Sequence, residues 1–444
     1  MINARRAVGS CLTVVVAVSA ACGGDGSDTA PGSGNFGLPA VRALPDSICS
    51  PISRGDQGEP DLLIAMSSLL QGQYAATHGL PAVKAVKLVL RERGWKAGRF
   101  AVALQVCDEA DAKTGVASPP KCERNARAIA TNRSVVAVLG PYFSTCGEAM
   151  IAALNEAPSG PVPIISGGNT YLGLTRSGPG TAPGEPDLYY PTGKRNYARV
   201  APTDDVQGAA AAVYAQDHGA ARAYALHNRD PYGQGLASAF GTAAERIGLE
   251  LAGTGSWNRD APDFRALAAR IAGARADAVY LAGYHSDNGG RLIRDLRDAL
   301  GERPLIMASD GFADAAPLVE AAGSRAEGVA LTIAVFPPKA LPPAGRAFVE
   351  RYEKRFSQRP CCYAVHFADA AAILLDTIAR SDGTRRSVLE ELLPSPQRDR
   401  LVGRFGLDEH GDTTLTSIGV YRIRDGKMRF ETHVIPPQGL LARE

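Results

Sequence analysis

Residues 135–175 limit the possible folds of this chain more than any other stretch. They open with the apolar run Val135–Leu139, which predicts a buried strand, and a Gly-Pro turn then leads to a helix expected over 148–155. A Pro/Gly break and a second short strand, Val162–Ser166, complete a β-α-β unit. Because such a crossover joins two parallel strands, this stretch predicts a parallel sheet with helices packed on it.

The same alternation of strand and helix patterns continues along most of the chain. Two series of similar size lie on either side of a Pro/Gly-rich insertion at 176–197, which we expect to be ordered because it contains tyrosines to bury. Two consecutive series imply an α/β fold with two parallel sheets, and therefore two lobes. We assign 60–198 and 335–402 to the first lobe, and 199–334 and 403–444 to the second.

The N-terminal residues are a different kind of sequence. Two arginines precede the apolar run Ala7–Val18, which is too short to span a bilayer as a permanent helix and is typical of a cleaved export signal over 1–21. The small residues before Cys22 resemble a bacterial lipoprotein box, although Ser19 stands where that box usually has Leu or Val. We therefore expect 22–59 to be a lipidated flexible tether and N-terminal lead. The alternative is an ordinary secretory signal followed by an incidental cysteine.

Export to an oxidising compartment changes how the cysteines are interpreted. Apart from the two near the N-terminus six remain, and thiols in such a compartment favour disulfides over metal ligation. Cys107 and Cys122 flank one loop and are the first pair that we expect. The second expected pair joins Cys49, in the N-terminal lead, to Cys146 in the central helix. The adjacent pair Cys361–Cys362 either forms a vicinal disulfide or stays as two free thiols.

Composition and motifs argue against several classes of function. Lys and Arg number 48 against 46 Asp and Glu, and this near-balance argues against nucleic acid as a partner. The sequence contains no CxxC pairs and no His/Cys clusters, so we expect no metal site and no cofactor. It also lacks the GxSxG, HExxH and GxxxxGKS/T motifs, which argues against an enzyme. A Ser/His/Asp set drawn from distant positions stays open as an alternative.

Polar residues follow both strands of the central β-α-β unit. Thr145 and Glu148 have the spacing of a capping box, which would place Ser144 and Thr145 at a helix N-terminus. The free N–H groups and the dipole of such a terminus suit a small anion, for example a carboxylate. Asn169 and Thr170 follow the second strand and reach the same edge of the sheet, where ligands of open α/β sheets bind. The alternative is that these side chains only cap a helix and close a turn.

Seven short strings, spread through the chain in a fixed order, carry a family resemblance. They are VLGPYFS, PIISGGNT, DPYGQG, DFRALAARI, AVYLAGYHSDNGG, LIMASDGF and GRFGLDEHGDTT. Over residues 60–430 the chain resembles the type I periplasmic binding proteins, in the branch of branched-chain amino-acid receptors of ABC importers. The resemblance implies two Rossmann-like lobes that clamp a ligand by a hinge motion. Three crossovers would join the lobes, near Arg199–Pro202, Leu331–Ala334 and Val402–Phe405.

The resemblance also implies a set of ligand contacts. Ser144 and Thr170 correspond to the family's contacts with the ligand carboxylate, Tyr232 and Tyr284 to its pocket aromatics, and Asp310 to the acid that receives the ligand ammonium. The role of Asp310 is chemically reasonable, because a buried carboxylate without a cationic partner is costly. The alternatives are that Asp310 caps a helix and that the two tyrosines pack the lobes together.

A role and a location follow from the same resemblance. A receptor of this kind is a monomer without enzymatic activity, tethered outside the cytoplasm by a lipid at Cys22, and it delivers a small-molecule ligand to an ABC permease. The ligand would be an amino acid or a related amine or carboxylate. An extracellular sensor with the same fold is the alternative, and a hydrolase is a more remote one. The insertion at 176–197 and the Cys361–Cys362 pair depart from the family pattern, so the ligand's side chain stays open.

Overall fold

The computed structural model describes residues 36–56 and 58–442. The expected signal peptide and Cys22 therefore lie outside the described residues. In the described part of the chain, none of the helices has both the length and the apolar character that crossing a bilayer requires.

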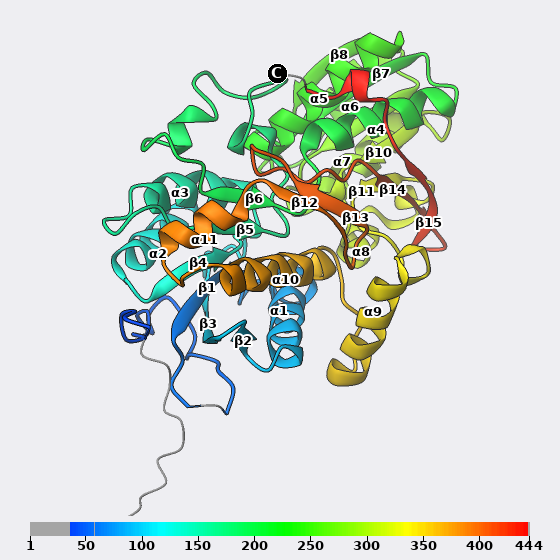
Figure 1. The fold of residues 1–444 in the computed structure, drawn as a ribbon. Helices are drawn as coiled ribbons and strands as arrows, with labels where there is room; N and C mark the ends of the chain where they lie inside the picture. Colours follow the sequence, from blue (N-terminus) through cyan, green and yellow to red (C-terminus); the bar gives the residue numbers. More distant parts are fainter. Residues whose placement is uncertain (1–35, 57, 443–444) are drawn as a thin grey trace, which may run out of the picture. The chain divides into compact units, whose positions relative to one another are not determined.

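The first sheet contains six strands in the order β2-β3-β1-β4-β5-β6 (Figure 1). Their bounds are β1 Leu62–Ser68, β2 Lys96–Ala97, β3 Phe100–Asp108, β4 Val135–Leu139, β5 Ile164–Ser166 and β6 Tyr197–Arg199. All neighbours pair in parallel except β2, which forms a short antiparallel edge with β3. The central strands are apolar on both faces, as strands covered by helices on both sides must be.

Helices cover both faces of this sheet, and β1 shows how the two faces are divided. The helices are α1 Leu80–Glu92, α2 Pro119–Thr131, α3 Ser144–Asn155, α9 Pro343–Phe356, α10 Ala364–Arg380 and α11 Arg385–Leu392. Successive side chains of a strand point to opposite faces. Ile64 and Met66 accordingly share a core with α1, α9 and α10, whereas Leu63 and Ala65 share a core with α2 and α3. The sheet, with these helices, is the first lobe.

The second sheet contains seven strands in the order β15-β14-β11-β10-β9-β7-β8. Their bounds are β7 Arg222–His227, β8 Glu250–Ser256, β9 Ala278–Ala282, β10 Leu305–Ala308, β11 Ala330–Ile333, β14 Ile418–Arg424 and β15 Lys427–Val434. The strands β7 to β11 are parallel, and β14 and β15 add an antiparallel hairpin at the edge. A separate two-stranded ribbon pairs β12 (Ser395–Asp399) with β13 (Arg404–Leu407).

Helices also cover both faces of the second sheet. They are α4 Asp204–Asp217, α5 Pro231–Ile247, α6 Arg265–Gly273, α7 Gly289–Leu300 and α8 Ala315–Ala322. One core contains side chains of α4 and α5, and the other contains side chains of α6, α7 and α8. This sheet with its helices is the second lobe. The predicted α/β fold, with parallel-strand sheets in two lobes, is confirmed.

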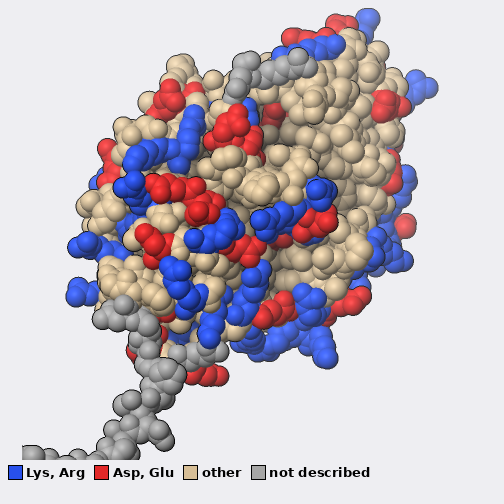
Figure 2. Space-filling view, viewed as in Figure 1, with Lys and Arg blue, Asp and Glu red and all other residues tan. Residues whose placement is uncertain are grey.

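The face drawn in Figure 2 carries Lys and Arg side chains interspersed with Asp and Glu. This mixing follows from the nearly equal numbers of basic and acidic residues, 48 and 46. Over the centre of this face basic and acidic side chains lie side by side.

The disulfide pairing that we predicted is wrong, although all four cysteines are bonded. The structure joins Cys49 to Cys107 and Cys122 to Cys146. The reason for the first pair is that the N-terminal lead runs antiparallel to β3, which places Cys49 directly opposite Cys107. The reason for the second is that the first turns of α2 and α3 pack together. Cys361–Cys362, by contrast, is a pair of free thiols.

Replacing Cys122 and Cys146 together with alanine is expected to lower the free energy of unfolding by about 3 kcal/mol. The bridge spans a sequence separation of 24 residues, so its removal restores conformational freedom to the unfolded chain. Urea denaturation of the variant and of the wild type measures the difference. A variant with an unchanged midpoint and slope would show that this bridge does not stabilise the fold.

Candidate functional site

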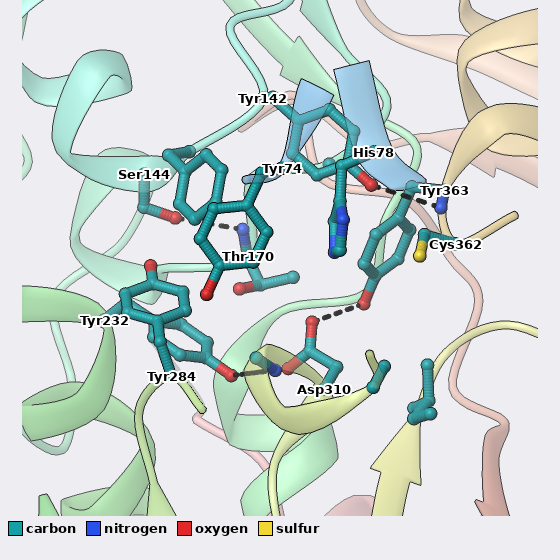
Figure 3. A pocket seen from close by; sticks show the side chains of 15 residues that line it. Tyr74, His78, Tyr142, Ser144, Thr170, Tyr232, Tyr284, Asp310, Cys362 and Tyr363 are labelled. Carbon is teal, nitrogen blue, oxygen red and sulfur yellow. Dashed lines mark hydrogen bonds between the residues drawn. The ribbon is translucent and has the colours of Figure 1, made fainter. Parts of the chain in front are cut away.

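A small cavity lies at the carboxyl ends of strands from both sheets, the edge at which open α/β sheets bind ligands (Figure 3). Its volume is about 40 Å³, which is room for a few water molecules, so a larger molecule enters only when the lobes separate. The lining residues are Tyr74, His78, Tyr142, Phe143, Ser144, Gly168, Thr170, Tyr232, Tyr284, Asp310, Gly311, Ala313, Ile333, Cys362 and Tyr363.

Ser144 forms one end of the cavity. It is the first residue of α3, after Phe143 in extended conformation, so the helix begins four residues before the predicted position. The Ser144 Oγ accepts hydrogen bonds from the N–H groups of Thr170 (3.3 Å) and Tyr171 (3.2 Å), which fixes the exit of β5 against the helix. Its own O–H remains available as a donor. Together with first-turn N–H groups that have no partner within the helix, it makes this end a site for an anion.

The other two residues predicted for this end lie elsewhere. Thr145 does not cap α3, because the N-cap is Phe143 and no side chain bonds there, and it lines a neighbouring cavity instead. The Asn169 Nδ2 donates to the carbonyl of Pro141 (3.1 Å), and its Oδ1 accepts from the Tyr197 hydroxyl (3.1 Å). Asn169 therefore holds the turn after β4 in place, and neither residue lines the central cavity.

Asp310 forms the opposite end, on the second lobe directly after β10. Its Oδ1 accepts from the Tyr232 hydroxyl (2.5 Å) and the Gln207 amide (3.0 Å), and its Oδ2 accepts from the Tyr363 hydroxyl (2.8 Å). Burial raises the pKa of Tyr232 and of Tyr363 well above its usual range, so both phenols stay protonated and donate. All of these partners are uncharged, and within residues 36–56 and 58–442 Asp310 forms no ion pair.

Burial shifts the pKa of two other ionisable groups near Asp310 toward the neutral form. Asp204 begins α4 and is 1% exposed, and both of its carboxylate oxygens lack hydrogen-bond partners among the described residues. Burial, and then repulsion from Asp310, raise the pKa of Asp204 well above its usual range. Burial also lowers the pKa of His78 to about 3, so its imidazole stays uncharged. Among the residues that line the cavity, Asp310 is the acceptor of negative character, and none is a Lys or Arg that could balance it.

Aromatic rings form the walls and connect the two lobes. Phe143 of the first lobe packs against Tyr284 of the second, with ring centroids 5.2 Å apart, and Tyr284 stacks on Tyr232 at 5.1 Å. Two hydrogen bonds also connect the lobes. The Tyr74 hydroxyl donates to the Ser286 hydroxyl (2.9 Å), and the Tyr363 hydroxyl donates to Asp310 Oδ2 (2.8 Å). The structure is therefore a closed form, in which the two tyrosines predicted for the pocket both line the cavity and pack the lobes together.

Five of the seven predicted contacts line this one cavity, namely Ser144, Thr170, Tyr232, Tyr284 and Asp310. Sequence reasoning missed Tyr74 and His78, which follow β1, and Tyr363, which precedes α10. Tyr142 and Phe143 were also missed, although they lie within the string VLGPYFS, where an aromatic pair just before a helix start is a usable signal.

Three comparisons describe what the chain is similar to. A family model described as periplasmic binding protein matches residues 62–427. Leu/Ile/Val-binding protein homolog 3 of Brucella melitensis is 27% identical over 205 residues, which cover 46% of this chain and 54% of the relative. The chain thus spans about half the length of this curated relative.

Solved structures extend the likeness to most of the fold. The crystal structure of a leucine binding protein, LivK, from Thermotoga maritima superposes with a TM-score of 0.71 at 25% identity, covering 84% of this chain and 99% of that one. A solute binding protein of R. palustris in complex with benzoate gives a TM-score of 0.67 at 19% identity, covering 84% of this chain and 96% of that one. The second likeness concerns the fold alone.

Proposed function

This chain belongs to the periplasmic binding protein family, and from that premise we propose that it is the extracytoplasmic solute-binding lipoprotein of an ABC importer, with an amino acid as its ligand. The observation that carries the proposal is that Ser144, on one lobe, and Asp310, on the other, face the same cavity. An amino acid carries an anion and a cation a few atoms apart, so one molecule can meet both ends only when the lobes are closed.

The ligand carboxylate binds at the start of α3 in this proposal. The Ser144 O–H donates to it, together with the backbone N–H groups of Ser144 and Thr145, which have no hydrogen-bond partner among the described residues, and the helix dipole adds a favourable field. Thr170, whose N–H is already fixed on Ser144, brings its hydroxyl to the same end of the cavity. Donors held in place before the ligand arrives lose little conformational entropy on binding.

The ligand ammonium binds at Asp310. Three uncharged donors hold this carboxylate, and no protein cation pairs with it in the described chain. Removing a carboxylate from water costs several kcal/mol unless a cation and hydrogen bonds compensate it. A ligand ammonium supplies that cation, and the surrounding rings of Tyr232 and Tyr284 favour it further.

An acid without an amine group, such as the benzoate bound by the R. palustris protein, is a poorer match. It would occupy the Ser144 end and leave Asp310 uncompensated in a dry cavity. We therefore favour an amino acid over an aromatic or aliphatic acid.

Closure provides the link to a permease. The contacts of Tyr363 with Asp310 and of Tyr74 with Ser286 form only when the lobes meet, so a bound ligand shifts the population to one composite surface that a permease can recognise. The hinge consists of the crossovers near Arg199–Pro202, Leu331–Ala334 and Val402–Phe405. The lipid at Cys22 keeps the receptor near its permease.

A thermal-shift panel on the purified protein tests the ligand class. L-leucine, 4-methylpentanoate, which lacks the amine, and 3-methylbutylamine, which lacks the carboxylate, form a matched set. We expect the amino acid to raise the melting temperature by mass action, because a hundredfold excess over Kd adds about 2.7 kcal/mol to the free energy of unfolding. Each analogue should bind at least tenfold more weakly. Native mass spectrometry should show one unchanged ligand per protein. A response to benzoate but to no amino acid would contradict the proposal.

A further inference from the structure

Two adjacent thiols stand in the wall of the ligand cavity. Cys361 and Cys362 lie in the segment between α9 and α10, both partly exposed, and Cys362 lines the cavity (Figure 3). Their Sγ atoms are 2.8 Å apart. That separation is longer than a disulfide bond, about 2.05 Å, and shorter than the ~3.5–4.0 Å at which even carbon atoms are in van der Waals contact. The two sulfurs are thus placed close to bonding distance.

The backbone explains this placement. Consecutive side chains of an extended segment point in opposite directions, which would separate the two sulfurs. Cys362 instead has φ +53°, in the left-handed region that few residues with a side chain adopt, and the turn brings both side chains to the same side. The carbonyl of Cys361 accepts the N–H of Ala364 at the start of α10, which anchors the turn (3.1 Å).

The chemistry of the pair favours reaction with a disulfide. The hydrogen bond with Cys362 lowers the pKa of the Cys361 thiol, and a thiolate is the nucleophile in thiol–disulfide exchange. Partial exposure lets a small disulfide reach it.

We propose that Cys361 and Cys362 form a redox site in the pocket wall, which oxidation converts to a vicinal disulfide and which sets the affinity for the ligand. The Cys361 thiolate attacks one sulfur of a low-molecular-weight or protein disulfide and releases one thiolate. Cys362 then loses its proton, displaces the second thiolate and closes the ring. The pair loses two electrons and two protons, and the attacking disulfide becomes two thiols.

Tyr363 couples this site to the ligand. It directly follows Cys362, its N–H donates to the Tyr142 hydroxyl (3.3 Å), and its phenol donates to Asp310 across the lobes (2.8 Å). A disulfide ring holds the turn rigid and so keeps Tyr363 against Asp310. Two separate thiols leave the turn free to change its backbone conformation, so Tyr363 is held less firmly against Asp310 in the reduced protein. The oxidised form should therefore bind an amino acid more tightly, by roughly tenfold.

The coupling rests on the proposed function, whereas the redox step does not, and the experiment separates them. The purified protein is equilibrated in reduced and in oxidised glutathione buffers, alkylated with iodoacetamide and analysed by peptide mass spectrometry, and the affinity for L-leucine is measured in each buffer by calorimetry. We expect two alkylated cysteines in the reduced protein and none at this pair in the oxidised protein. The two buried disulfides should stay intact in both.

Two variants serve as controls. Cys361→Ser alone, and Cys361→Ser with Cys362→Ser, should each show one affinity for L-leucine that is the same in both buffers. Failure of the pair to oxidise would overturn the redox site. Oxidation with equal L-leucine affinities in both buffers would overturn the coupling. If neither form binds any proteinogenic amino acid, the proposed ligand class fails while the oxidation, read by mass, still supports the redox site.

Discussion

Asp310→Asn is expected to weaken the binding of an amino acid by about 4 kcal/mol, on the order of a thousandfold. The asparagine keeps the shape of the side chain and an oxygen for the Tyr232 and Tyr363 phenols, so the lobes should still close. It removes the negative charge that compensates the ligand ammonium, and Asp310 is the single carboxylate among the residues described as lining the cavity. Calorimetry with L-leucine measures the loss.

Asp314→Asn provides the matched control. Asp314 precedes α8 four residues further along the chain, and it does not line the cavity. This variant also loses one negative charge near the site, but it should change the affinity by no more than about 0.5 kcal/mol. Circular dichroism checks that the Asp310→Asn protein is folded. If the folded variant binds L-leucine as tightly as the wild type, Asp310 does not contact the ligand.

The fold was predicted well from the sequence because the apolar residues of each strand and helix follow the period of that element within a short stretch of chain. The run Val135–Leu139 is β4 to the residue, and the alternation of patterns required parallel sheets. The start of α3 was misplaced because Thr145 and Glu148 match the capping-box pattern, whereas the Ser144 hydroxyl binds the exit of β5. A sequence pattern within one helix cannot reveal a hydrogen bond to a segment that lies more than twenty residues further along the chain.

The site residues that were predicted differ from those that were missed in how closely their place in the chain determines their place in the fold. Asp310 and Ser144 stand at strand exits, where position in the chain implies position at the sheet edge. Tyr363 and Cys362 precede α10, and their place in the cavity depends on how the chain packs after it returns to the first lobe. Cysteine pairing depends on such packing as well, since Cys49 meets Cys107 through an isolated bridge of the N-terminal lead.

A buried ion pair centred on Asp412 gives the second large expected effect. Asp412 accepts from Arg199 Nε (2.8 Å), the Thr175 hydroxyl (2.8 Å) and Arg176 Nε (3.0 Å), and the Arg199 side chain is fully buried. The backbone N–H of Arg199 also donates to the carbonyl of Gly411 (2.8 Å). These bonds join β6 to the turn after β13, next to two of the proposed hinge crossovers.

Asp412→Asn is expected to lower the free energy of unfolding by about 4 kcal/mol at pH 7, because it leaves the Arg199 guanidinium buried without its counter-charge. Urea denaturation measures the loss. Glu390→Gln is the control: its pair with Arg386 is exposed on α11, so its removal should cost less than about 0.5 kcal/mol. Equal losses in the two variants would show that burial does not strengthen the Asp412 pair.

The pH dependence of the same variant tests the electrostatic origin of the effect. Burial alone would raise the pKa of Asp412, but the charge of Arg199 and the hydrogen bonds from Thr175 and Arg199 outweigh burial and hold the pKa below its usual range. A folded-state pKa below the unfolded value, about 3.9, gives a stabilisation that is fully present above that value and is lost as the pH falls through the folded pKa. The stability difference between wild type and Asp412→Asn should therefore be constant from pH 7 to about 5 and shrink below about 4. A difference that stayed constant down to pH 3 would assign the loss to packing rather than to charge.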